Sequence, residues 1–297
     1  MSEIQHQIRK YCEYSRVFKG NSERTIQTYQ FELVSFSNAT GILSASEISR
    51  TLIEQYVVKR KLENAWSAKT IRNRLMTMRI FLDWCRKQDI ITDNPAREID
   101  LPRLPKRLPR HLSREQADKL MQWTQHYRYE YASERPRAVA IIALFLFAGL
   151  RRNELLNLKV EDVQLQAGRI FVRSGKGDKD RIIPINETLA EYLRTYLQER
   201  DRRKRQCPNF FVSLRRDHAM DERAIPRLVQ KLRVASGVYF SPHVLRHTFA
   251  TLMLEGGADI FAISKMMGHS DIKTTTIYLS ATTAHLKSEI SKHSLTI

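Results

Sequence analysis

The stretch AVAIIALFLFAGLRRNE, residues 138–154, runs from an apolar segment directly into two arginines. Its first thirteen residues carry no polar side chain, so we expect them to be buried. Spanning a membrane takes roughly twenty such residues, so the stretch predicts a core helix over 135–149 instead. Gly149 can end that helix by adopting a positive φ, which places Arg151 at the edge of a rigid, buried platform.

Arg151 and Glu154 are one helical turn apart, and the pair allows two interpretations. In the first, the two side chains form a structural ion pair. In the second, the guanidinium faces a bound anion while Glu154 orients it from behind through charge-assisted hydrogen bonds. The residues alone favour neither interpretation.

The composition indicates a globular protein that binds a polyanion. The chain has 297 residues, enough for two domains, with 42% hydrophobic and 28% charged residues. The net charge of +18 is spread over both halves of the chain, so nucleic acid is the expected partner and a merely solubilising surface is the alternative. Three scattered cysteines predict neither a disulfide framework nor a zinc site. With no apolar secretory segment at the start, we expect a cytoplasmic, nucleoid-associated protein.

Residues 1–100 are expected to form a helical, DNA-binding domain. Ser22, Ser46 and Ser67 each precede apolar residues at helical spacing and are expected to mark helix starts. In the third helix, steps of four and three predict a core stripe of Ile71, Leu75, Met78, Leu82 and Cys85. The opposite flank is basic, and phosphate contact is slightly favoured over a solvated face for Lys69, Arg72, Arg74 and Arg79.

Residues 101–111 are expected to link two domains. The segment LPRLPKRLPR, 101–110, contains three prolines that prevent helix formation. Its basic residues, with no acidic residue among them, predict phosphate contacts; they include Arg103, Lys106 and Arg107. Ser113 and Gln116 then match a capping box at the start of a second domain, residues 112–297.

The second domain is expected to add a small β-sheet to helices, which makes the fold mostly α with a small sheet (α+β). A hairpin is predicted over 169–185, with Pro184 confining its second strand to an edge or an end. The basic segment 200–205 is expected to be a solvated helix end. Helices are predicted over 113–128, 135–149, 152–158, 187–205, 222–236, 243–255, 258–267 and 271–278.

Further candidate functional residues follow in the second domain. In SPHVLRHTFAT, residues 241–251, His243 and Arg246 share one helix face near an N-terminus that favours anions, and His247 lies on an adjoining face in a supporting role. A lone histidine is more often structural, but a His–Arg pair in a basic chain favours function. The other candidates are a histidine presented by a glycine turn, a late tyrosine that in isolation reads as a core aromatic, and a lysine at the hairpin tip: His269, Tyr278 and Lys176. No carboxylate cluster offers a magnesium site, so no metal or other cofactor is expected.

Five motifs occur in order: G-L-R-x-x-E-L-x-x-L from 149, G-K-G-x-K-x-R from 175, H-x-L-R-H-T-F-A-T from 243, G-H-S from 268, and a tyrosine at 278. Together they resemble the tyrosine recombinase family of phage integrases and Xer-type recombinases. The helical first domain and its proline-rich linker are similar to the Xer subgroup. The resemblance implies a catalytic second domain with Arg151, Lys176, His243, Arg246, His269 and the nucleophile Tyr278.

The resemblance also implies the chemistry of DNA strand exchange. Two arginines and His269 would stabilise the charge of a five-coordinate phosphorus, and Lys176 would protonate the departing 5′-oxygen. A tyrosine is only about 0.3% ionised near pH 7.5, so a base is needed, and His243 is the candidate. The product would be a 3′-phosphotyrosyl link, from which strands can be rejoined without ATP.

The family implies a tetramer, homomeric or with a related recombinase, across two duplex DNA sites with inverted-repeat cores. A Xer-like role in resolving replicon dimers and an integrase or resolvase role in a mobile element are both open. Two other functions are alternatives: a catalytically inactive DNA-binding regulator, and a strand-relaxing enzyme like type IB topoisomerases. The intact residue set argues against the regulator.

Overall fold

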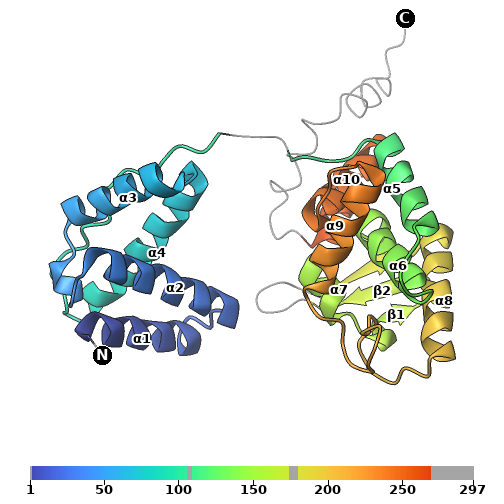
Figure 1. Cartoon of the computed structure of the whole chain (residues 1–297), viewed down its shortest axis with the longest axis horizontal. Helices are drawn as coiled ribbons and strands as arrows, with labels where there is room; N and C mark the ends of the chain where they lie inside the picture. Colours follow the sequence, from blue (N-terminus) through green and yellow to red (C-terminus); the bar gives the residue numbers. More distant parts are fainter. Residues whose placement is uncertain (1, 106–108, 174–179, 269–297) are drawn as a thin grey trace, which may run out of the picture. The chain divides into compact units, whose positions relative to one another are not determined.

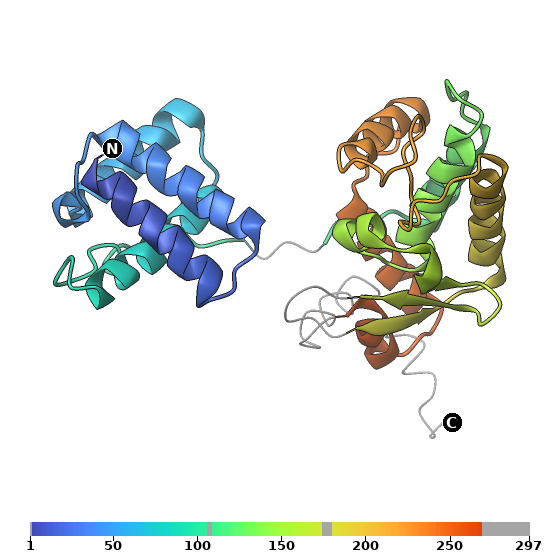
Figure 2. The same cartoon turned by 90° about the horizontal axis from the view of Figure 1, so that it is seen from below.

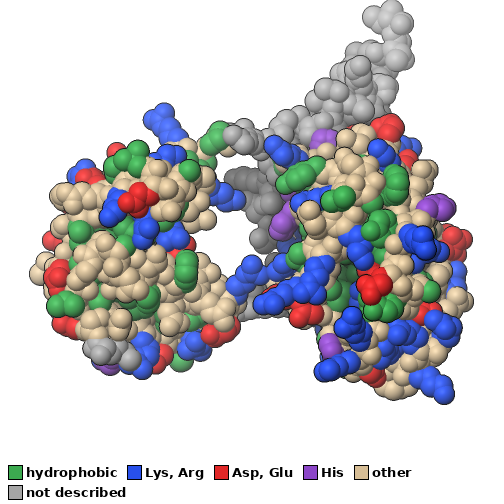
Figure 3. Space-filling model, in the orientation of Figure 1, with side chains coloured by type: hydrophobic (Ala, Val, Ile, Leu, Met, Phe, Trp, Pro, Cys, Tyr) green, Lys and Arg blue, Asp and Glu red, His purple; other side chains and the backbone are tan. Residues whose placement is uncertain are grey.

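The computed structural model describes residues 2–105, 109–173 and 180–268. The chain divides into two compact units, Met1–Lys106 and Arg107–Ile297. Figure 3 shows Lys and Arg side chains across the visible face of both units, with fewer Asp and Glu side chains between them. The hairpin turn that carries Lys176 and the predicted helix over 271–278 lie outside the described residues.

The first unit is a bundle of α-helices (Figure 1). Ser22 and Ser67 cap the second and fourth of them as predicted, because their hydroxyls accept hydrogen bonds from the backbone N–H groups of Thr25 and Thr70. The predicted stripe of the fourth helix faces the core, where Tyr11 packs against the ring of Phe81 at 5.4 Å. Within residues 2–105 the helices are α1 (Glu3–Val17), α2 (Glu23–Thr40), α3 (Arg50–Asn64) and α4 (Ala68–Lys87).

The helix expected directly after Ser46 begins later, so that prediction was wrong. A short 3-10 turn, Ala45–Glu47, comes first, and the Glu47 carboxylate closes it by accepting from the backbone N–H groups just before it. α3 then starts at Arg50, and Ser49 caps it by accepting from the Leu52 N–H at 3.2 Å. Because several neighbouring serines can each cap a helix, the Glu47 side chain, which stabilises the 3-10 turn, determines that α3 starts after Ser49.

The second unit is built around the apolar stretch quoted above. Every residue from Ala138 to Leu146 is buried, and they form α6 (Glu134–Phe147), which confirms the predicted core helix. The helix packs against α5 (Arg114–His126), α8 (Glu187–Arg202) and α10 (Pro242–Glu255). Ser113 and Gln116 form the predicted capping box at the start of α5. The remaining helices of the described part are α7 (Arg152–Asn157), α9 (Ala224–Ser236) and α11 (Ile260–Met267).

A small antiparallel sheet lies on one side of this unit (Figure 2). Its strands, in the order β1-β2-β3, are β1 (Val163–Gln164), β2 (Arg169–Val172) and β3 (Arg181–Pro184). The predicted hairpin pairs β2 with β3, with Val172 opposite Arg181, and Pro184 ends the edge strand as predicted. β1 was not predicted, because its two residues are too few to show an alternating pattern.

The basic segment 200–205 is not wholly solvated, which corrects the prediction for Arg200. This side chain is buried, and its guanidinium donates hydrogen bonds to the carbonyls of Cys207, Asn209 and Phe210. The loop after α8 would otherwise leave these carbonyl groups unpaired, and a planar, multidentate donor satisfies all three.

Candidate active site

Gly149 turns the chain between α6 and α7, as predicted. Its φ is +59°, and a Cβ atom at this position would lie 2.4 Å from Cδ1 of Phe249 in α10. Because Phe249 and Leu150 are both buried, the turn cannot move outward. The turn therefore delivers Arg151 to the start of α7 with little positional freedom.

Glu154 accepts hydrogen bonds from two arginines that are far apart in the sequence. The Arg151 backbone N–H and Nη1 donate to its two oxygens at 2.7 and 2.8 Å. Arg181, the first residue of β3, donates from Nη1 and Nη2 to the same two oxygens at 2.8 and 2.7 Å. The Glu154 side chain is only 9% exposed, whereas that of Arg151 is 31% exposed. The structural ion pair therefore exists, and it leaves the Arg151 guanidinium partly accessible to an anion.

Arg246 brings a third guanidinium to the same carboxylate. Its Nη1 lies 4.0 Å from Oε2 of Glu154 and donates to the Gly149 carbonyl. Its Nη2 donates to the Met267 carbonyl at 2.5 Å. The Arg246 side chain is buried, so three guanidinium groups surround one carboxylate and leave an excess of positive charge. Such an excess favours binding of an anion.

The three arginines also bind three consecutive carbonyl groups at the end of α11. Arg181 Nε donates to Met266 O at 2.6 Å, Arg246 Nη2 donates to Met267 O, and Arg151 Nη2 donates to Gly268 O at 2.7 Å. The C-terminal end of a helix carries a partial negative charge, which guanidinium groups stabilise. The segment that leads to position 269 is thus attached to the cluster.

Glu154 stays ionised in this setting. Burial alone would raise the pKa of its carboxyl, but the hydrogen bonds and positive charge of Arg181, with those of Arg151, outweigh burial and lower the pKa to about 2. The Glu154 carboxylate therefore keeps its negative charge, and with it its ion pairs to Arg151 and Arg181, at neutral and mildly acidic pH.

The two histidines of α10 have different surroundings. The helix begins at Pro242, one residue before the predicted start, and Ser241 caps it by accepting a hydrogen bond from the Val244 N–H. His243 is exposed one turn before Arg246. His247 is half-buried, and burial, followed by the nearby positive charges of His243, Arg246 and His111, lowers its pKa to about 4. A neutral His247 is consistent with the supporting role that we expected for it.

Several predicted residues cannot be placed. Lys176, His269 and Tyr278 lie outside the described residues, and the same holds for Lys106 and Arg107 of the linker. Of the six catalytic candidates, the structure thus brings Arg151, Arg246 and His243 to one region. Arg181 was quoted as part of a motif but was given no role, and its pairing with Glu154 was missed.

Comparison with known families assigns this fold. The sequence profile described as "Phage integrase family" matches residues 110–285, and that of "Phage integrase, N-terminal SAM-like domain" matches residues 8–89. The chain belongs to the phage integrase family. It is a tyrosine recombinase, an enzyme of site-specific DNA strand breaking and rejoining.

Relatives of the recombinase are found in archaea and bacteria. It is 32% identical to "Tyrosine recombinase XerA" of Pyrococcus horikoshii over 99% of this chain and 94% of that protein. It is also 32% identical to "Tyrosine recombinase XerC" of Actinobacillus pleuropneumoniae, over 94% of this chain and 90% of that protein. These matches support a recombinase over the regulator and the topoisomerase-like enzyme.

Solved structures share the fold of the recombinase. The crystal structure of a XerA recombinase, 30% identical, matches 98% of this chain and 100% of that chain with a TM-score of 0.55. The XerH recombinase, solved as a post-cleavage complex on a palindromic difH substrate, matches 97% of this chain and 84% of that chain with a TM-score of 0.75 at 23% identity.

Two of the basic residues predicted on α4 of the recombinase contact its own backbone. Arg79 donates to the carbonyls of Ala96 at 2.9 Å, Arg97 at 3.3 Å and Ile99. Arg72 donates to the carbonyl of Pro102 at 3.4 Å. These contacts attach the segment after α4 to the helix, which favours a structural role for Arg79 over a DNA contact.

The same segment is bonded to α4 a second time. The Asn94 side-chain amide donates to the Arg79 carbonyl at 2.9 Å and to the Asp83 carboxylate at 2.8 Å. Asp83 also accepts from Arg97 at 2.8 Å. Residues 94–99 are thus part of the α4 structure, although no helix includes them.

Arg74 differs from Arg79. Its guanidinium stacks on the indole of Trp66, 4.2 Å from the ring centroid, and lies 6.0 Å from the ring of Phe31. Within the described residues it makes no hydrogen bond or ion pair, and its buried Nε has no partner. Stacking holds a guanidinium in place while leaving its edge available for an anion or a base. Lys69 and Arg103 are exposed.

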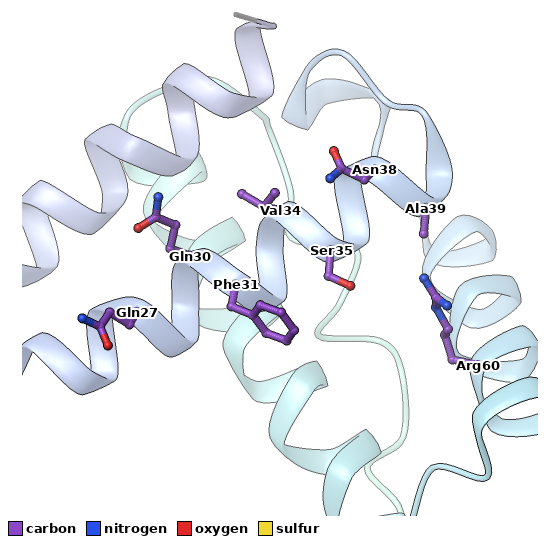
Figure 4. A pocket seen from close by; sticks show the side chains of 8 residues that line it. All are labelled: Gln27, Gln30, Phe31, Val34, Ser35, Asn38, Ala39 and Arg60. Carbon is purple, nitrogen blue, oxygen red and sulfur yellow. The ribbon is translucent and has the colours of Figure 1, made fainter. Parts of the chain in front are cut away.

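A shallow groove of about 660 Å³ lies on the first unit (Figure 4). It includes Phe31, whose ring lies 6.0 Å from the Arg74 guanidinium. It runs along α2, where the exposed ring of Phe31 projects among amide and hydroxyl side chains, and Arg60 of α3 lies at one end. The groove was not predicted, and the one sign of it in the sequence was a phenylalanine, Phe31, between polar residues of α2. The lining residues are Gln27, Gln30, Phe31, Val34, Ser35, Asn38, Ala39 and Arg60.

The described part of the chain offers neither a metal site nor a membrane-spanning helix. Within residues 2–105, 109–173 and 180–268, no group of three His, Cys, Asp or Glu side chains is placed to hold a metal ion. No helix in these ranges is long and apolar enough to cross a membrane.

Proposed function

We propose that this recombinase cleaves duplex DNA through Tyr278 while Arg151 and Arg246 hold the scissile phosphate. The supporting observation is that both guanidinium groups bind adjacent carbonyls, Gly268 O and Met267 O, at the end of α11. They therefore lie beside the segment that continues to His269 and Tyr278. An arginine pair fixed in this way can bind the non-bridging oxygens of a phosphate without rearranging during the reaction.

In the proposed reaction, the Tyr278 hydroxyl oxygen attacks phosphorus and the bond from phosphorus to the 5′-oxygen breaks. His243 takes the tyrosine proton, and Lys176 gives a proton to the departing 5′-oxygen. The exposed position of His243, one turn from Arg246, supports its assignment as the base. His269 donates a hydrogen bond to the phosphate. A 5′-hydroxyl from another strand then reverses these steps and rejoins the DNA.

The proposed partner is duplex DNA with an inverted-repeat core site. The net charge of +18 supports it, as does the likeness in fold to XerH, which was solved on its difH substrate. Residues 1–100 would bind DNA through Lys69 and Arg74, residues 101–111 would link the domains through a basic segment, and residues 112–297 would carry out catalysis. The enzyme would act in the cytoplasm as a tetramer, homomeric or with a related recombinase, in replicon dimer resolution or mobile-element transfer.

Covalent capture tests this function. A pool of nicked duplex oligonucleotides with randomised inverted-repeat arms is incubated with the full chain, and adducts are separated on a denaturing gel. A nick beside the cleavage point lets the 5′-hydroxyl fragment leave, which traps the protein on its DNA. Wild type is expected to form adducts and Tyr278→Phe none, and sequencing the trapped DNA gives the site for all later assays.

The outcomes separate the competing functions. Binding of a selected sequence without any adduct from wild type would indicate a regulator and contradict the proposal. Adducts with relaxation of supercoiled plasmid, but without recombinant junctions on paired sites, would indicate a strand-relaxing enzyme. Recombinant junctions with wild type, lost in Tyr278→Phe, support the recombinase.

A further inference from the structure

Arg181 is a buried arginine of the active-site region to which the reaction described above gives no role. It begins β3, directly after the segment that carries Lys176, and its side chain is 7% exposed. A buried guanidinium is costly unless its donors are paired. The two Nη atoms of Arg181 donate to Glu154, and its Nε donates to the Met266 carbonyl. Glu154 also binds the catalytic candidate Arg151, and Met266 lies three residues before the candidate His269.

These contacts join three segments that are distant in the sequence. Glu154 belongs to α7 and holds Arg151, Met266 belongs to the end of α11, and Arg181 itself belongs to the hairpin. The close packing of Gly268 is a separate observation of the same junction. A Cβ atom on Gly268 would lie 3.0 Å from both Cδ and Nη1 of Arg181. The end of α11 is therefore seated directly against the Arg181 side chain.

Arg181 contributes more hydrogen bonding and positive charge to Glu154 than its neighbours do. Among the residues that the structure describes, the charged groups that face Glu154 are Arg151 from the loop before α7, Arg181 from β3 and Arg246 from α10. Arg181 donates one side-chain hydrogen bond to each carboxylate oxygen, and it is the main influence that offsets the burial of Glu154. Arg151 instead uses its backbone N–H and one side-chain nitrogen.

We propose that Arg181 is a positioning residue for strand cleavage, which acts by fixing Glu154 so that Glu154 fixes the Arg151 guanidinium. Through Met266 it also holds the hairpin strand against the end of α11. This inference rests on the proposed function, because it concerns the same reaction. It assigns Arg181 no contact with DNA.

Arg181→Gln tests the proposal, and Arg173→Gln is the matched control. Arg173 follows β2 on the other side of the same hairpin turn, and it pairs with Asp162 and Glu161 rather than with Glu154. Each variant is assayed as the full chain on the site found by covalent capture. Two quantities are measured: the single-turnover rate of adduct formation at saturating protein, and the Kd for the intact duplex.

Arg181→Gln is expected to slow adduct formation by about 10- to 100-fold while its Kd stays within about threefold of wild type. Arg173→Gln is expected to stay within about twofold of wild type in both quantities. In the double variant with Glu154→Gln, the losses should not add, because Arg181 acts through Glu154. Equal rates in the two arginine variants, a matching loss of affinity, or additive losses would each overturn the proposal.

Arg181→Lys covers the case in which the glutamine variant fails to fold, as judged by circular dichroism and Tm. Lysine keeps the charge but cannot donate a planar fork to both carboxylate oxygens. It should bind DNA like wild type and cleave several-fold more slowly, and wild-type cleavage by this variant would refute the role. If wild type itself forms no adduct, the proposed function fails instead, so the two failures are distinguishable.

Discussion

Gly149 and Phe249 are in contact where the chain turns toward Arg151: a Cβ atom on Gly149 would lie 2.4 Å from Cδ1 of the phenylalanine. We therefore expect Gly149→Ala to lower the free energy of unfolding by roughly 2–4 kcal/mol, since it adds both backbone strain and a steric clash. Urea unfolding measures this loss, and adduct formation should fall with it because Arg151 moves.

Gly168→Ala is the matched control for this prediction. Gly168 has a φ of +61°, close to that of Gly149, but a Cβ atom there would meet nothing within 4 Å. It should cost only the backbone strain, about 1–2 kcal/mol. Equal losses in the two variants would show that contact with Phe249 does not matter.

Glu154 should make the stability of the protein depend on acid. Its pKa is about 2 in the folded state, below the value of about 4.3 for an unfolded glutamate, so ionisation stabilises the fold. This contribution is complete above the unfolded value and is lost as the pH falls toward the folded one. The difference in unfolding free energy between wild type and Glu154→Gln should therefore shrink by about 1.5–2 kcal/mol between roughly pH 5.5 and pH 3, out of a total of about 3 kcal/mol that is lost only below the folded pKa.

Urea unfolding at several pH values measures this gap. Glu161→Gln serves for comparison, because Glu161 is a surface carboxylate, 64% exposed, that pairs with Arg173. The difference in unfolding free energy between Glu161→Gln and wild type should change little over the same pH range. A constant gap for Glu154→Gln would mean that the carboxyl is not stabilised in its charged form.

His247 should titrate well below the ordinary range of a histidine. Burial, together with the positive charges of His243, Arg246 and His111, lowers its pKa to about 4, so the folded protein resists protonation that the unfolded chain accepts. Stability from this group is complete above the unfolded pKa of about 6.5 and is lost as the pH falls toward 4. NMR titration of the imidazole, assigned by loss of its signals in His247→Gln, should show the neutral ring near pH 6; a midpoint above 6 would contradict the prediction.

Replacement of Arg79 should lower mainly the stability of the first unit, whereas replacement of Arg74 should lower mainly the affinity for DNA. Arg79→Gln removes hydrogen bonds to three carbonyls and should lower the free energy of unfolding of the first unit by roughly 2–3 kcal/mol. Arg74→Gln removes only a stacked side chain, and it should weaken DNA binding by about tenfold while reducing the salt slope by about 0.9 if the contact is to phosphate.

Denaturation curves and Kd values over a range of salt concentrations test both variants. Each serves as the control of the other, since both remove one arginine from α4. Loss of DNA affinity in Arg79→Gln without a loss of stability would reverse the assignment.

Local signals in the sequence were sufficient for much of this fold. The unbroken apolar run predicted α6, Ser22 and Ser67 predicted helix starts, and Gly149 predicted a turn with positive φ. Each of these depends on residues within one or two turns of the chain. Before α3, by contrast, three serines lie within six residues, and each could cap a helix. The Glu47 side chain stabilises a short 3-10 turn there, so α3 is capped by Ser49 and the start predicted after Ser46 was wrong.

The missed features depend on contacts between distant residues. Arg181 meets Glu154 across 27 positions, and no periodicity in the sequence marks that pairing. Arg200 was expected in solvent because arginine is rarely buried, yet the carbonyls after α8 supply its partners. On α4, four similar basic residues were grouped together, and only their hydrogen bonds separate Arg79 from Arg74.

Because residues 94–99 are bonded to α4 at two places, they determine where this chain can be joined to a segment of another protein in a chimaera. A chimaera that exchanges the first unit at the visible end of α4 would separate Asn94, Arg97 and Ile99 from the side chains that bind them. A splice placed after residue 100 carries the helix and its bonded tail together. Exchange of the first unit of this protein for that of another integrase should therefore succeed at the later junction and yield insoluble hybrids at the earlier one.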